Sequence, residues 1–120
     1  MTKESITKIK VLIEQFFQYR KVRNYSDKSE EQTRWGLVYF LSFMETRDEE
    51  NLNQITVETL NKFQMHVYSM LGLRGKPLGL ISQLHILVSV RVFFQWLIQV
   101  AEVVLMLFED KNLLPWLTRW

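Results

Sequence analysis

Residues 80–98, LISQLHILVSVRVFFQWLI, decide the fold of this chain of 120 residues. At about 3.6 residues per turn, the stretch predicts a helix with one broad apolar face. From Val92 onward the opposite face is apolar as well, and a helix that is apolar all round packs on more than one side. We therefore expect a central helix whose C-terminal half is enclosed by other helices. The predicted core face holds Leu80, Leu84, Leu87, Val90, Arg91, Phe94, Leu97 and Ile98.

The N-terminal half of this helix differs, because its second face carries polar, uncharged side chains. Ser82, His85 and Ser89 lie there, opposite the predicted core face. We expect this stripe to face outward, and it is the first candidate for a functional surface.

Composition bounds the class of protein. The chain is 48% hydrophobic and 13% aromatic, which is typical of a single globular domain rather than a disordered segment. It has no cysteine, which excludes a disulfide framework, a thiolate nucleophile and a zinc finger. The charged start, MTKESITKIK, is unlike a signal peptide, and the apolar run at 103–108 is too short to span a bilayer. We expect no membrane partner.

The net charge of +2 hides an uneven distribution. Residues 1–25 carry six Lys or Arg against two Glu, and residues 26–58 carry three basic side chains against eight acidic ones. Residues 59–101 contain no Asp or Glu but keep four cations. Such a stretch permits approach to a polyanion, and it is equally explained by burial, since buried helices exclude acids.

The rest of the pattern is helical throughout. The spacing predicts a helix over residues 5–20, a second from a capping box of Ser29 and Gln32, and a third from an N-cap at Thr56 to Gly72. The pattern stays helical after the central stretch through about Phe108, and no segment alternates with period two. The predicted fold is therefore all-α, a bundle of four to five helices.

The sequence offers no catalytic motif. His66 and His85 lie on different predicted helices, and no zinc-protease motif, carboxylate pair or nucleophile elbow occurs. The glycine-rich loop at 72–79 does not match a phosphate loop, and the acids at 48–50 are typical of a solvated loop. We infer a binding module without a cofactor or metal.

Several segments together resemble the tyrosine recombinases (phage integrases). The segment SQLHILVSVRVFFQWL at 82–97 resembles that family's T-x-x-x-x-L-x-x-L-R-x-F-F-x-W-L helix. The segment from Tyr25 to Met44 is similar to its L-S-x-x-T … L-x-x-F-L-x-F-L second helix. Residues 52–60 resemble the start of its third helix, and Leu113-Leu114-Pro115 resembles the L-x-L-P before its catalytic domain. The resemblance covers residues 6–115.

The resemblance implies a SAM-like core-binding domain over residues 1–115, which in that family forms half of a clamp around duplex DNA. Residues 116–120 would begin a linker to the catalytic domain of the same parent protein. That domain, with its Arg, His-x-x-Arg and Tyr, is missing here, so this chain is expected to bind DNA without cutting it. A bacterial or phage-encoded cytoplasmic protein is implied. The family's DNA-facing helix ends correspond to Lys28, Ser29 and Gln32 on the second helix, and Ser82 and His85 on the fourth.

Each of these residue types has a role in such a site. Ser29 and Ser82, near helix N-termini, could offer hydroxyls and free backbone N–H groups to phosphates, or merely cap their helices. Lys28, Arg74 and Lys76 would add positive charge. The candidates for contacts to base edges are Gln32, Gln83 and His85.

The chain departs from the family pattern at a few positions. Ile86 stands where members often carry Arg, Met106-Leu107 replaces a frequent Asn-Pro, and residues 100–102 lack the usual Gly or Asn turn. The alternative function is a helical protein–protein interaction domain, whose partner surface would be residues 97–108 with Trp116 and Trp120. We also expect the apolar C-terminal helix to pack on the bundle or to self-associate.

Overall fold

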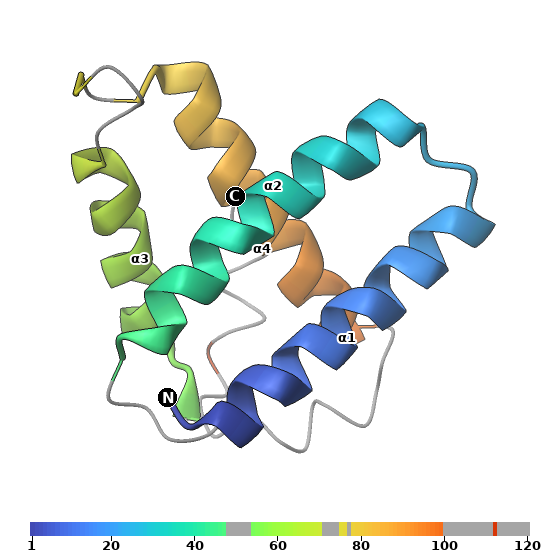
Figure 1. Cartoon of the computed structure of the whole chain (residues 1–120), viewed down its shortest axis with the longest axis horizontal. Coiled ribbons are helices and arrows are strands. Elements are labelled where there is room, and N and C mark those ends of the chain that lie inside the picture. Colours follow the sequence, from blue (N-terminus) through green and yellow to red (C-terminus); the bar gives the residue numbers. More distant parts are fainter. Residues whose placement is uncertain (48–53, 71–74, 77, 100–111, 113–120) are drawn as a thin grey trace.

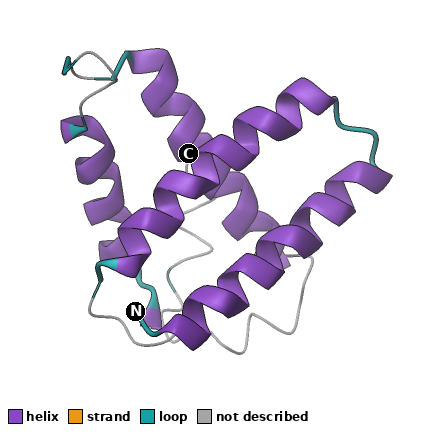
Figure 2. Cartoon of the chain, viewed as in Figure 1, coloured by secondary structure: helices purple, strands orange, loops and turns teal. Residues whose placement is uncertain are grey.

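The computed structural model describes residues 1–47, 54–70, 75–76, 78–99 and 112. Four helices form a compact all-α globule: α1 (Lys3–Val22), α2 (Asp27–Glu45), α3 (Val57–Ser69) and α4 (Leu80–Gln99). The described residues contain no strand (Figure 2). The all-α prediction is confirmed. The third helix, predicted to end at Gly72, ends earlier, at Ser69, because the backbone of its C-cap Met70 is already extended. The predicted continuation to Phe108 and the C-terminal helix lie outside the described residues.

Polar caps set where three of the helices begin. The side-chain oxygens of Thr2, Ser26 and Thr56 each accept a hydrogen bond from the backbone N–H three residues later. The predicted cap at Thr56 is therefore confirmed, but the predicted capping box at Ser29 and Gln32 is wrong. Ser26 is the N-cap of α2 instead, because serine is an equally good cap at that position.

Aromatic rings join the helices inside the core. The Phe40 ring of α2 lies edge-on to Phe63 of α3 and Phe94 of α4, with centroids 5.3 and 5.5 Å apart. The Phe16 ring of α1 packs edge-on against Phe93 of α4 at 5.6 Å. The predicted enclosure of the C-terminal half of α4 is confirmed, since Phe93, Phe94, Leu97 and Ile98 are all buried.

The helices α2 and α4 cross and form the most extensively packed pair (Figure 1). A Cβ atom on Gly36 would lie 2.5 Å from Ser89 Oγ, 2.6 Å from Ser89 Cβ and 3.2 Å from Ile86 Cα. Only a residue without a side chain fits there. The Ser89 hydroxyl donates to the backbone carbonyl oxygen of His85 at 2.6 Å, so it is buried without an unmet hydrogen bond.

This crossing corrects the prediction for the N-terminal half of α4. Ser89 is buried and not part of an outward stripe, and Ile86 is fully buried in the core. Leu80 and Leu84, which were predicted to be in the core, are exposed. The helical wheel misses this because apolar residues occur on every side of the helix, so periodicity cannot say which side meets α2.

Among the described residues, one helical segment, Leu80–Ile98, is long and apolar enough to cross a membrane by length and hydropathy alone. The central helix of a bundle has the same properties. Here α1, α2 and α3 all pack against α4, which makes it the central helix of this fold.

We predict that Gly36→Ala lowers the free energy of unfolding by about 1–3 kcal/mol, because the new methyl group overpacks the crossing. Helix propensity alone predicts the opposite, a gain of about 1 kcal/mol. Urea unfolding would measure the change, with the exposed α2 substitution Ser42→Ala as a control that stays within about 0.5 kcal/mol. Adding Ser89→Gly to Gly36→Ala should recover part of the loss. A Gly36→Ala variant more stable than the parent would contradict the contact.

Candidate nucleic-acid interface

Beyond the crossing, the N-terminal halves of α2 and α4 diverge (Figure 1). Side chains of both halves line a groove between the two helices. Its volume is about 490 Å³. We call it the α2–α4 groove. It is lined by Arg20, Tyr25, Ser29, Gln32, Thr33, Ile81, Leu84, His85, Val88, Ser89 and Val92.

The α2 wall of the groove is polar. Ser29, Gln32 and Thr33 line it, and the Thr33 hydroxyl donates to the Ser29 carbonyl oxygen at 3.0 Å. The backbone N–H of Ser29 donates to Ser26 Oγ at 3.2 Å. The prediction that Ser29 offers a free backbone N–H to a phosphate is therefore wrong, because Ser26 caps the helix and uses that group.

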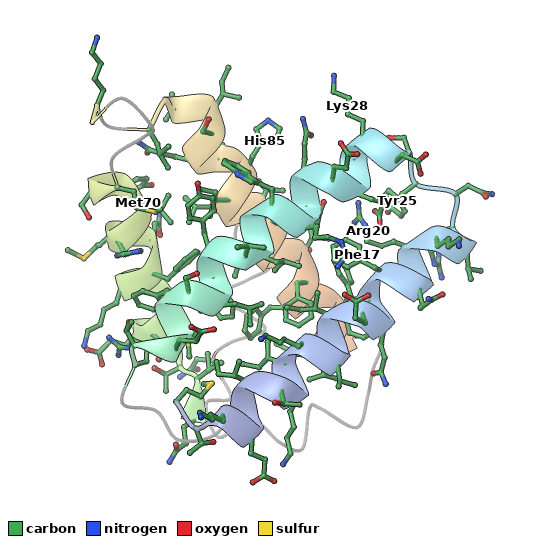
Figure 3. The ribbon with its side chains drawn as sticks, viewed as in Figure 1. Phe17, Arg20, Tyr25, Lys28, Met70 and His85 are labelled. Carbon is green, nitrogen blue, oxygen red and sulfur yellow. The ribbon has the colours of Figure 1, made fainter. Side chains whose placement is uncertain are left out.

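Arg20 lines the groove, although it is not among the residues predicted from the sequence to bind DNA. It is 6% exposed, although the other cations of α1 are exposed. Its Nε donates to Glu30 Oε1 at 2.5 Å, and its guanidinium lies 3.9 Å from the centre of the Tyr25 ring. This arrangement ties the end of α1 to the start of α2 (Figure 3). The sequence does carry a sign of this burial, because residue 20 continues the helical spacing of the apolar residues Ile13 and Phe16.

The α4 wall is mostly apolar, and its polar residues among the lining are His85 and the buried Ser89. Ile81, Leu84 and Val88 line the groove and are exposed, while His85 lies between them and is half-buried. His85 and Lys28 extend from the same edge of the molecule, one from each helix (Figure 3). The stripe predicted to be polar is thus a mixed one.

The predicted DNA-binding residues lie in different parts of the structure. Ser29, Gln32 and His85 line the groove together. Lys28 and Lys76 are exposed, and Ser82 and Gln83 are half-buried in the first turn of α4. The side-chain amide of Gln83 donates to the Leu78 carbonyl oxygen at 2.9 Å, so it holds the start of the helix. Arg74 lies outside the described residues.

The two helix ends at the groove differ in charge. The first turn of α2 carries Asp27 and Glu30, which complement the helix dipole and would repel a phosphate. The first turn of α4 carries no acid. The backbone N–H groups of Leu80, Ile81 and Ser82 have no hydrogen-bond partner among the described residues. The α4 end therefore suits an anion better than the α2 end.

The described residues contain no cluster of three or more His, Asp or Glu that could hold a metal ion. Comparison of the chain with protein-family models, curated proteins and solved structures found no match.

We predict that Glu30→Ala lowers the free energy of unfolding by about 3 kcal/mol, because it leaves the buried Arg20 guanidinium without its anion. The matched control is Glu14→Ala, which breaks the Glu14–Arg34 pair at 2.7 Å on the same two helices. Both side chains of that pair are at least half exposed, so its loss should cost less than about 1 kcal/mol. Urea unfolding of the two variants would compare them. Equal losses would show that Arg20 is not held by Glu30.

Proposed function

We propose that this chain is the DNA-binding core domain of a phage-type integrase or tyrosine recombinase. In this proposal, residues 1–115 form the SAM-like clamp half, and residues 116–120 lead to the catalytic domain of the same cytoplasmic parent protein. The observation that carries the proposal is that residues from two separate motifs lie in one groove. Gln32 and Ser29 on α2 and His85 on α4 were selected by resemblance to two separate motifs, and all three line one groove.

The geometry supports different roles for different residues on duplex DNA, with some contacting phosphates and others contacting base edges. The first turn of α4 would contact phosphates, because it carries no acid and its backbone N–H groups have no partner within the described part of the chain. Lys28 and Lys76 are exposed and would neutralise phosphates on either side. Gln32 and His85 would meet base edges in the major groove, where a Gln amide can pair with adenine. Gln83 would position the helix end, since its amide is bound to Leu78.

A single observation favours a second candidate function. Ile81, Leu84 and Val88 expose apolar surface on one wall of the α2–α4 groove. An exposed apolar row is typical of a surface that meets another protein, so a helical protein–protein interaction domain is the alternative. Its predicted partner surface at 97–108 with Trp116 and Trp120 falls mostly outside the described residues.

We predict weak and strongly salt-dependent binding to duplex DNA. Three cations, Lys28, Arg74 and Lys76, give a slope of about −2.7 in log K against log salt, or about a 40-fold loss of affinity from 50 to 200 mM salt. Fluorescence anisotropy of a labelled 20-base-pair duplex at those two salt concentrations would measure it. Binding that is unchanged by salt would contradict a phosphate-contacting surface.

A paired substitution tests where the duplex binds. Ser82→Glu with His85→Glu puts two carboxylates beside the phosphates and should abolish binding at 50 mM salt. Thermal stability should change little, because acids are favourable near a helix N-terminus.

The chain supplies a matched control for this variant. His66→Glu with Ser69→Glu changes the same residue types at the same spacing on α3, no residue of which lines the groove. This control should bind within about threefold of the parent. An equal loss of DNA affinity in both variants would show that the effect comes from net charge alone. Unfolding of the Ser82/His85 variant alone would favour the protein-interaction function.

A further inference from the structure

The α2–α4 groove contains an apolar row that the proposed phosphate and base-edge contacts leave unused. Ile81, Leu84 and Val88 are 71%, 50% and 41% exposed. They occupy positions i, i+3 and i+7 of α4 and therefore follow one side of the helix. His85 lies on the same wall, and Gln32 lines the wall opposite. A duplex that reaches His85 and Gln32 would also meet this row.

The major-groove edges of the bases present one apolar group, the C5-methyl group of thymine. The other groups on these edges are hydrogen-bond donors and acceptors, which aliphatic side chains would desolvate without replacing their hydrogen bonds. From Ile81 to Leu84 the helix rises about 4.5 Å, close to one base-pair step of about 3.4 Å, and from Ile81 to Val88 it rises about 10.5 Å, close to three steps. The row is therefore long enough to meet methyl groups on successive base pairs.

We propose that Ile81 and Leu84 of this row bind thymine methyl groups, so that the chain selects duplexes with A·T pairs at adjacent positions. This inference rests on the proposed DNA-binding function and adds the kind of sequence that is selected. Gln32 on the opposite wall fits the same selection, since its amide can pair with the N6 and N7 atoms of an adenine.

Val88 contributes less in this arrangement. It is the least exposed of the three and lies nearest the crossing, one residue before the buried Ser89. The two outer residues, Ile81 and Leu84, are the ones that a base could reach first.

The experiment starts with the full chain and a pool of random 20-base-pair duplexes at low salt. Selection should enrich duplexes with adjacent A·T pairs. The enriched duplex is then made again with deoxyuridine in place of thymidine, which removes the methyl groups and leaves the charges and hydrogen-bonding edges unchanged. Anisotropy titrations should show about a fourfold loss of affinity for each contacted methyl group.

Two variants locate the effect. Leu84→Ala and Ile81→Ala should each weaken binding to the thymidine duplex and reduce the preference over the deoxyuridine duplex. Both residues are exposed, so both variants should fold. Met65→Ala is the matched control, because Met65 is an apolar residue of α3 that is as exposed as Ile81 and does not line the groove. It should keep the full preference.

The outcomes separate this inference from the proposed function. Salt-sensitive binding with no enrichment of A·T pairs, or with equal affinity for the two duplexes, would overturn the inference and leave DNA binding in place. A preference that persists in both alanine variants would also overturn it, because the methyl groups would be sensed elsewhere. No binding to the starting pool at low salt would overturn the proposed function itself and would favour a protein partner for the apolar row.

Discussion

The contact between Gly36 and Ser89 is the constraint on which the rest of this structure depends. It lets the backbones of α2 and α4 approach until a single added methyl group would collide. The two helices diverge from that point (Figure 1). Phe40 of α2 and Phe94 of α4 pack together in the aromatic core, and side chains of the N-terminal halves line the groove. The candidate binding surface is thus a consequence of how the core packs.

A second restraint acts at the start of α2, beside this groove. Arg20 joins the end of α1 to the start of α2 through Glu30 and the Tyr25 ring, and it is nearly completely buried. Because its charge is paired with Glu30, it adds little attraction for a phosphate. Its contribution to the proposed function is to position Ser29 and Gln32 on the polar wall. The charges that attract DNA would come from exposed side chains and from the N-terminus of α4.

The sequence predicted the helices better than it predicted their orientation. The apolar spacing correctly predicted four helices and the burial of the C-terminal half of α4. The residue type of Thr56 correctly predicted its helix cap. Periodicity failed for Leu84 and Ser89 because the close approach at Gly36, a long-range contact, decides which side of α4 is buried. The resemblance to a family selected Gln32 and His85, and both line the α2–α4 groove. It did not reveal Arg20, whose burial depends on a glutamate ten residues away, or the exposed apolar row beside His85.

The central claim is that the N-terminal halves of α2 and α4 form one surface for duplex DNA. Mapping of backbone amide chemical shifts in the isotope-labelled chain, as a 20-base-pair duplex is added at low salt, tests it most directly. The claim predicts that the largest changes fall in residues 25–33 and 78–89, with α3 and the first half of α1 nearly unaffected. Changes concentrated on α3, or none on either side of the α2–α4 groove, would contradict it.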